Sequence, residues 1–258
     1  MKTILLVLLI FAFSSSALAF DFNNKEEIEY KVTFMGMTVV RAYINGDPVN
    51  PSDSGSYRLS IKARTTKFWN MFYPLENYYL TYMDTTGAPL IYRRNINEKS
   101  FKNITEQNYD HKLNRIYYEG NTAVDHPGQL ENFFSAVYKL RTMPMEIGVI
   151  DSFYLNIEKA AWLVIVTVEG NKSINVLDEK TDCFEIDAKF VPMNQTANRL
   201  PTDILTNKLV NSGTDLTLFI SNDERRVPAK MVYNMTPFDV NVTVTKYSFG
   251  ESEHNNRK

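Results

Sequence analysis

Strict alternation of apolar and polar residues runs through most of the chain and constrains its fold more than any other feature. In YRLSIKA (57–63), the apolar residues Tyr57, Leu59 and Ile61 alternate with polar and charged ones. Successive side chains of a β-strand point to opposite faces of a sheet, so this period of two predicts half-buried strands. The same alternation marks further strand candidates at residues 29–34, 89–96, 114–120, 152–157, 162–170, 183–190, 215–220, 227–233 and 239–249.

Short turn-forming segments separate these candidates, for example NGDP (45–48), SDSG (52–55) and TTGAP (85–89). About a dozen short strands with tight connections are typical of an antiparallel meander. We therefore predict an all-β fold, in which the meander curls into a barrel, a roll or a sandwich. The regular alternation of strands with helices is missing, which argues against a parallel α/β enzyme.

One segment, residues 126–143, follows the helical period instead. Its apolar residues fall on one helical stripe: Leu130, Phe133, Phe134, Val137 and Leu140. We predict a single amphipathic helix near residues 129–141, which begins close to Pro127 and is capped by Asp125 or its neighbours. Its phenylalanine-rich face is expected to pack on the concave side of the sheet or in the mouth of a barrel.

The N-terminus carries the features of a secretory signal. One lysine precedes an apolar run, and Ala17-Leu18-Ala19 has the small-x-small form of a cleavage site. The run is too short to span a bilayer, which needs roughly 20 residues. We predict a signal peptide at 1–19, a single β-rich domain at 20–250 and a disordered tail at 251–258. The mature protein is expected to be exported and not an integral membrane protein.

Charge and cysteine content exclude several classes of function. The net charge is −2, and the basic residues form no stripe along the sequence, so nucleic-acid binding is not expected. Cys183 is the single cysteine, so no internal disulfide can form, and we expect a packed structural thiol. The histidines His111, His126 and His254 lack the spacing of a metal site, and phosphate-loop and dinucleotide glycine motifs are absent. No cofactor and no metal are predicted.

The densest aromatic cluster lies at residues 65–84. Seven aromatic residues fall within it: Phe68, Trp69, Phe72, Tyr73, Tyr78, Tyr79 and Tyr82. Such a cluster can form part of a core, or it can line an apolar ligand pocket. If a ligand binds here, we expect it to contact Trp69, Phe72, Tyr73 or Tyr79.

A polar cluster, SNDERR (221–226), separates two of the strand candidates. As a hairpin turn, it would use Asp223 or Asn222 to bind backbone amides two residues on, with an arginine paired to the carboxylate. Pro228 would then sit at an edge or a bulge, because proline donates no ladder hydrogen bond. As a site, Arg225 or Arg226 would bind a carboxylate or phosphate at the rim of the pocket.

Several segments together resemble one family of exported bacterial proteins of unknown function, the DUF3108 family. They are EYKVTFMGMTVVRAYI, FYPLENYYLTYMDTTGAPLIYRRNINE, YDHKLNRI, the helix LENFFSAVYKLR and the hairpin LTLFISNDERRVPAKMVY. The helix resembles the family's Ser-x-x-Tyr-x-x-Arg pattern, and the hairpin its Asp-x-x-Arg turn. The resemblance covers about residues 26–247 and departs at LDEKTDCFEI, where a glycine is expected. It implies an envelope location, periplasmic above all, and a mostly β fold, and it offers no catalytic residues.

Three hypotheses of function follow. The first is a non-catalytic envelope protein that binds an amphipathic or glycan ligand or assists envelope assembly. The second is a cell-wall hydrolase that uses Asp125 and His126, or a pair of carboxylates. No nucleophile motif such as Gly-x-Ser-x-Gly accompanies that pair. The third is a structural partner that pairs with another envelope protein through an edge strand.

Overall fold

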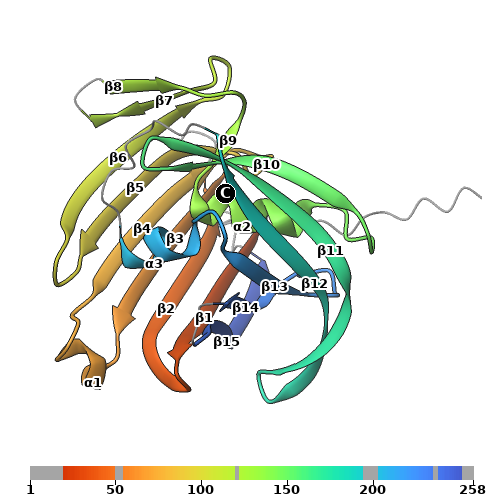
Figure 1. The fold of residues 1–258 in the computed structure, drawn as a ribbon. Coiled ribbons are helices and arrows are strands. Elements are labelled where there is room, and N and C mark those ends of the chain that lie inside the picture. The colour runs from red at the N-terminus through yellow and green to blue at the C-terminus, as the bar shows by residue number, and fades with distance from the viewer. Residues whose placement is uncertain (1–19, 50–54, 120–121, 194–202, 235–237, 252–258) are drawn as a thin grey trace, which may run out of the picture.

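The computed structural model describes residues 20–49, 55–119, 122–193, 203–234 and 238–251. Within them, one mainly antiparallel sheet of fifteen strands curls around a central helix (Figure 1). The predicted all-β fold with a meander is confirmed, although the strands exceed the expected dozen and the curled sheet does not close. The predicted signal peptide and nearly all of the tail lie outside the described residues.

The elements follow the predicted alternation closely. The strands are β1 (Asn24–Phe34), β2 (Met37–Pro48), β3 (Tyr57–Thr65), β4 (Glu76–Met83), β5 (Pro89–Asn97), β6 (Lys102–Asp110), β7 (Arg115–Tyr118), β8 (Thr122–Asp125), β9 (Leu130–Glu131), β10 (Ile150–Ile157), β11 (Ala160–Val176), β12 (Glu179–Pro192), β13 (Asp215–Ser221), β14 (Pro228–Asn234) and β15 (Val240–Glu251). The helices are α1 (Lys67–Asn70), α2 (Phe133–Thr142) and α3 (Ile204–Leu209).

The order of the strands in the sheet explains its shape. It runs β8-β7-β6-β5-β4-β3-β2-β1-β15-β14-β13-β12-β11-β10-β9, so neighbours in the sequence are neighbours in the sheet. The first and last strands pair along most of their length, from Asn24 opposite Glu251 to Phe34 opposite Val240. This pairing joins the two halves of the meander. The sheet therefore has its two edges at β8 and β9, in the middle of the sequence.

Cross-strand register places the large aliphatic residues on the concave face. Ile28 lies opposite Ile44, Ile44 opposite Ile61, and Ile61 opposite Tyr79, across β1 to β4. Directly opposed residues of an antiparallel pair point to the same face. The next row toward the lower end of Figure 1 holds Tyr30 opposite Ala42 and Ala42 opposite Ala63, so two small residues lie side by side inside the curl.

The helix α2 lies inside the curl, as expected, but it starts later than predicted. Residues Leu130–Glu131 form β9, which pairs in parallel with β10, and Asn132 caps the helix. The Asn132 side chain accepts hydrogen bonds from the amides of Phe134 and Ser135, and the Ser135 hydroxyl accepts one from the Asn132 amide. The prediction that the helix begins close to Pro127 and is capped by Asp125 or its neighbours was wrong, because the capping box lies farther along, at Asn132 and Ser135.

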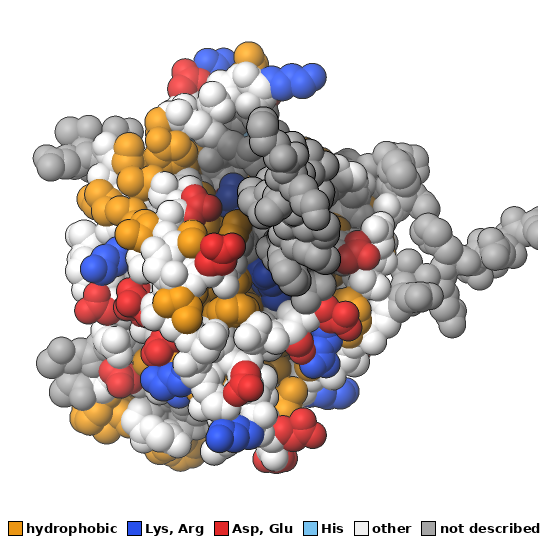
Figure 2. Space-filling view, turned by 90° about the vertical axis from the view of Figure 1, so that its right-hand side faces the viewer, with side chains coloured by type: hydrophobic (Ala, Val, Ile, Leu, Met, Phe, Trp, Pro, Cys, Tyr) orange, Lys and Arg blue, Asp and Glu red, His pale blue; other side chains and the backbone are white. Residues whose placement is uncertain are grey.

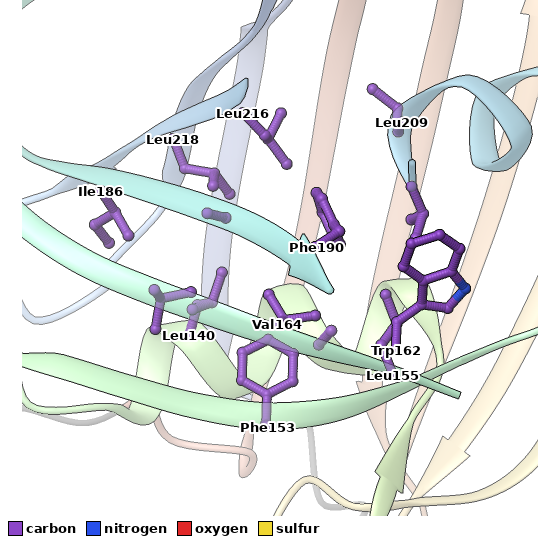
Figure 3. Packing of buried hydrophobic residues seen from close by; sticks show 14 of the residues in the cluster. Leu140, Phe153, Leu155, Trp162, Val164, Ile186, Phe190, Leu209, Leu216 and Leu218 are labelled. Atoms are coloured by element: carbon purple, nitrogen blue, oxygen red, sulfur yellow. The ribbon is translucent and has the colours of Figure 1, made fainter. Parts of the chain in front are cut away.

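The largest buried cluster packs β10–β13 against α2 and α3. Figure 3 shows Phe153 and Val164 on the side of Leu140 of α2, and Trp162 on the side of Leu209 of α3. The helix is enclosed on most of its circumference, since Ala136, Tyr138, Leu140 and also the polar residues Ser135 and Arg141 are buried.

Side chains bridge the gap between the two edges of the sheet. Asn156 of β10 donates to Gln107 of β6 at 2.8 Å and accepts from the Tyr118 hydroxyl of β7 at 2.9 Å. In the turn after β10, Glu158 accepts a hydrogen bond from Arg94 of β5 at 2.6 Å. Both partners of this ion pair are nearly completely buried. Buried polar groups therefore hold the two halves together where backbone pairing ends.

Candidate functional site

The concave face of the sheet encloses an apolar cavity of about 120 Å³, which we call the inner hollow. Its sheet wall includes Ala42 and Ala63, and its other walls come from Phe134 and Val137 of α2 and Leu209 of α3. The small side chains of Ala42 and Ala63 leave space that the neighbouring isoleucine rows fill. The predominantly apolar walls favour apolar guests.

A second apolar cavity of about 320 Å³, the end hollow, lies nearer the β1–β2 turn. Its lining consists of Val32, Phe34, Val39, Val40, Thr65, Trp69, Tyr73, Leu75, Ile204, Leu209, Tyr233 and Val240. Val32 and Leu209 line both hollows, so the two cavities are neighbours. The volume of the end hollow falls within the range of small-molecule pockets, roughly 300–1,000 Å³.

Two buried carboxylates hold α3 in place between the hollows. Glu98 accepts hydrogen bonds from Asn77 Nδ2 at 2.8 Å, from the Tyr73 hydroxyl at 3.1 Å and from the Ile204 amide at 3.2 Å. Asp203 accepts from the Thr206 amide at 2.9 Å and caps the helix. Burial raises the pKa of Glu98, and the nearby Asp203 carboxylate raises it further. These contacts give both carboxylates a structural role at the start of α3.

The four predicted aromatic residues separate into three environments. Trp69 and Tyr73 line the end hollow, and Tyr79 lines the inner hollow. Burial raises the pKa of Tyr79, which therefore stays a neutral phenol. Phe72 lines neither hollow; its side chain is exposed, and its ring packs against Phe68 at 5.4 Å.

The polar cluster SNDERR (221–226) forms the turn between β13 and β14. Asp223 accepts hydrogen bonds from the amides of Arg225 and Arg226 at 3.1 Å, as predicted for a hairpin turn. Its carboxylate also binds the Arg225 guanidinium at 2.9 Å. The predicted bulge is confirmed too, because the register shifts where Ile220 meets Pro228.

The two arginines of this turn do not line either hollow. The Arg226 guanidinium donates to the Met143 carbonyl at the end of α2, and the Arg225 carbonyl accepts from Arg141 at 2.9 Å. The turn therefore fastens the C-terminal end of α2. Lys230, which sequence reasoning did not single out, is a basic residue that lines the inner hollow.

The sequence analysis also missed a buried charge cluster beside the inner hollow. Glu26 of β1 and Arg141 of α2 form a bidentate ion pair at 2.7 and 2.9 Å, and both side chains are completely buried. Tyr138 donates its hydroxyl proton to the same carboxylate, and Phe20 stacks on the guanidinium at 3.8 Å. The one signal was the Ser-x-x-Tyr-x-x-Arg pattern, whose three members, Ser135, Tyr138 and Arg141, are all buried.

Asp125 and His126 are adjacent in the sequence but have separate surroundings. The Asp125 carboxylate is exposed and binds the Arg115 guanidinium at 2.5 and 3.0 Å. Burial lowers the pKa of His126 to about 4, and its Nε2 atom has no hydrogen-bond partner within the described ranges. This arrangement lacks the hydrogen-bonded acid–base pair that the hydrolase hypothesis requires.

Other chemical groups add no site within the part of the chain that the structure describes. No group of three or more His, Cys, Asp or Glu side chains is placed there to hold a metal ion. Cys183 is completely buried, and burial raises the pKa of its thiol to about 11. No helix among these residues is long and apolar enough to cross a bilayer. Figure 2 shows acidic and basic side chains intermixed with apolar ones over one face.

Comparison with known proteins identifies the family. A family model, described as a protein of unknown function (DUF3108), matches residues 29–244. The match extends from β1 into β15. It includes the strands that line the two hollows, the helix α2 and the turn between β13 and β14. No curated protein matches the chain.

The comparison with solved structures gives one match with a similar fold and others with lower TM-scores. A β-barrel-like protein of domain of unknown function DUF1849 from Brucella abortus is 8% identical, with a TM-score of 0.56 over 89% of this chain and 99% of that chain. An inferred lipoprotein from Parabacteroides distasonis covers 89% of this chain and 97% of its own, with 8% identity and a TM-score of 0.34. An inferred exported protein with a YmcC-like fold from Bacteroides fragilis covers 90% and 99%, with 8% identity and a TM-score of 0.33. At this identity, the similarity to the Brucella protein concerns the fold alone.

Proposed function

Because the chain belongs to the DUF3108 family, whose function is not established, we propose from its geometry that it is an exported, non-catalytic envelope protein that binds an amphipathic ligand. The ligand's apolar chain occupies the end hollow and reaches toward the inner hollow, and its polar head stays outside. The apolar end hollow is the observation that carries this proposal, since burial of apolar surface drives binding.

The composition of the lining favours an acyl chain over a glycan. Among the twelve residues around the end hollow, only Thr65, Trp69, Tyr73 and Tyr233 carry a polar side-chain atom. The Tyr73 hydroxyl is already bound to Glu98. A glycan needs many hydrogen-bond partners, because an unpaired buried hydroxyl costs about 1–3 kcal/mol. A methylene chain needs none, and each buried CH₂ contributes about 0.8 kcal/mol.

A titration with a fluorescent fatty acid tests the proposal. The probe is a dansyl-labelled undecanoic acid, added to protein that has been delipidated and purified after export. We expect saturable binding of one probe per chain, with a blue shift of the dansyl emission as the probe enters an apolar site.

The variant Val40→Trp fills the end hollow, because Val40 is buried and lines it. We expect this variant to bind about tenfold more weakly, or about 1.4 kcal/mol. The matched control is Val191→Trp on an exposed position of β12, which should bind like the wild type. Circular dichroism melts verify that both variants fold. Absence of saturable binding, or equal binding by the two variants, would contradict the proposal.

A further inference from the structure

An exposed apolar rim surrounds one end of the curled sheet, where α1 and the β1–β2 turn lie at its lower end in Figure 1. Its members are Met35 and Met37 of the turn region, Phe68, Met71 and Phe72 in and beside α1, and Phe238 before β15. Their exposed fractions range from 43% for Phe238 to 71% for Met71. Such a group of large exposed apolar side chains is uncommon on the surface of a soluble protein, unless it is a binding site for a protein, a membrane or a ligand.

Named contacts join the three segments into one surface. Thr66, which precedes α1, donates from its amide to the Val39 carbonyl at 3.0 Å and from its hydroxyl to the Thr38 carbonyl at 3.2 Å. The ring centroids of Phe34 and Phe238 lie 6.1 Å apart. α1 has no buried residue, and the rings of Phe68, Trp69 and Phe72 pack on one another. The rim is therefore a single apolar surface held at the end of the sheet.

Basic residues stand behind the rim on the convex face. Lys31 lies opposite Arg41, and Arg41 lies opposite Arg64, so three cations form a row across β1, β2 and β3. Lys67 belongs to α1, and Lys99 donates to the Phe72 carbonyl at 3.1 Å. Within the described ranges, none of these five cations forms an ion pair with a carboxylate, although Arg64 does bind the Tyr43 hydroxyl.

The acidic residues close to the rim do not cancel this charge. Glu76, the next member of the row on β4, is bound by Lys62 at 2.8 Å. Asp239 adjoins Phe238 and is exposed. Glu98 and Asp203 also lie near this end, but both are buried. Within the described ranges, the five cations outnumber the exposed Asp239, so the surface at this end of the sheet is positively charged.

We propose that the apolar rim docks the protein on an anionic bilayer surface. Lys31 lies four residues from Met35 and Arg41 four residues from Met37, or about 13 Å along the strands at about 3.3 Å per residue. An apolar wedge that enters the bilayer by about 5–10 Å therefore brings these cations to the level of the lipid phosphates. Methionine and phenylalanine suit this wedge because they have no polar group to desolvate.

The position of the end hollow adds a consequence. Phe34 and Trp69, which line that hollow, are neighbours of Met35 and Phe68 in the rim. Docking through the rim would therefore orient the end hollow toward the acyl chains of the bilayer. This consequence rests on the proposed function, whereas docking itself depends only on the rim and its cations.

Vesicle flotation tests the docking. The probes are vesicles of phosphatidylcholine alone and of phosphatidylcholine with phosphatidylglycerol. We expect the full-length exported protein to float with the anionic vesicles and to be released by high salt. The triple variant Phe68→Ser/Met71→Ser/Phe72→Ser should partition about tenfold or more weakly. A matched triple variant, Leu113→Ser/Ile147→Ser/Ile150→Ser, removes equally exposed apolar side chains elsewhere and should float like the wild type.

A charge variant separates the electrostatic contribution. Arg41→Gln/Arg64→Gln should weaken flotation with anionic vesicles and make it less sensitive to salt, whereas Lys180→Gln/Lys189→Gln on β12 should change little. Brominated lipids should quench Trp69 fluorescence, while the buried Trp162 supplies a constant background. Failure of the wild type to float, or equal loss in rim and control variants, would overturn the proposal and favour a protein partner. The fatty-acid titration is run on the same variants, so failure of docking and failure of ligand binding are told apart.

Discussion

Glu26 and Arg141 form the contact that ties α2 to the first strand across 115 residues of sequence. Both side chains are completely removed from water, so each charge depends on the other for its stabilisation. Removing one partner of such a pair costs more than the pair itself contributes, because the remaining charge stays buried. The sequence pattern of the helix does not reveal this pair, since nothing in the local pattern shows a partner so far away.

The first prediction concerns this pair. Glu26→Gln keeps the size of the side chain but leaves the Arg141 charge unpaired, so we expect a loss of about 3–5 kcal/mol in the free energy of unfolding. The control Glu27→Gln affects a half-exposed carboxylate beside Lys25 and should cost about 1 kcal/mol or less. Urea unfolding measures both. Equal losses in the two variants would show that the buried pair has no special role.

His126 provides a prediction about pH. Burial lowers its pKa from 6.5 to about 4, with the Asp125 carboxylate opposing this shift. The unfolded chain therefore takes up the proton first, and the contribution of His126 to stability is present above its unfolded pKa of 6.5 and lost as the pH falls toward about 4. His126→Gln should flatten this part of the stability profile.

The measurement compares urea midpoints of the wild type and His126→Gln at about pH 7 and about pH 5. The difference between the two proteins isolates His126 from groups that titrate in the opposite direction. Glu98 is one such group, since its raised pKa makes its contribution larger in acid. An unchanged difference between the two pH values would contradict the account of His126.

At the scale of elements, the alternation of residues predicted the strands well and the helix less well. The apolar stripe located α2, but Leu130–Glu131 pair with β10 and end up in the sheet. The pairing with β10 decides that these two residues form a strand, and the local sequence does not reveal that pairing. The stripe also omitted Ser135 and Tyr138, which are buried because they bind Glu131 and Glu26.

The capping box of α2 gives a third prediction. Asn132→Ala removes the acceptor for the amides of Phe134 and Ser135, and both amides are then left without that partner. We expect a loss of about 1–2 kcal/mol in the free energy of unfolding. Asn132→Ser, which restores a capping oxygen, should recover most of it. A loss as large in the serine variant would mean that Asn132 acts through packing and not through its cap.

At the scale of the whole molecule, the meander and its curl follow from the sequence, but the hollows do not. Trp69, Tyr73 and Tyr79 were singled out as pocket residues, and they line the two cavities. The space itself depends on Ala42 and Ala63 meeting across β2 and β3, which requires the register. The seam between β6 and β10, where Asn156 meets Gln107, likewise joins residues 49 positions apart in the sequence.

The proposed function depends above all on the end hollow accepting an acyl chain. Diffraction from crystals soaked with a brominated fatty acid, at the bromine absorption edge, tests this directly. We expect an anomalous peak among Val32, Val40 and Leu209, which line the end hollow, and no such peak in Val40→Trp crystals. A peak confined to the convex face of the sheet, or hollows that stay empty at saturating fatty acid, would contradict the account.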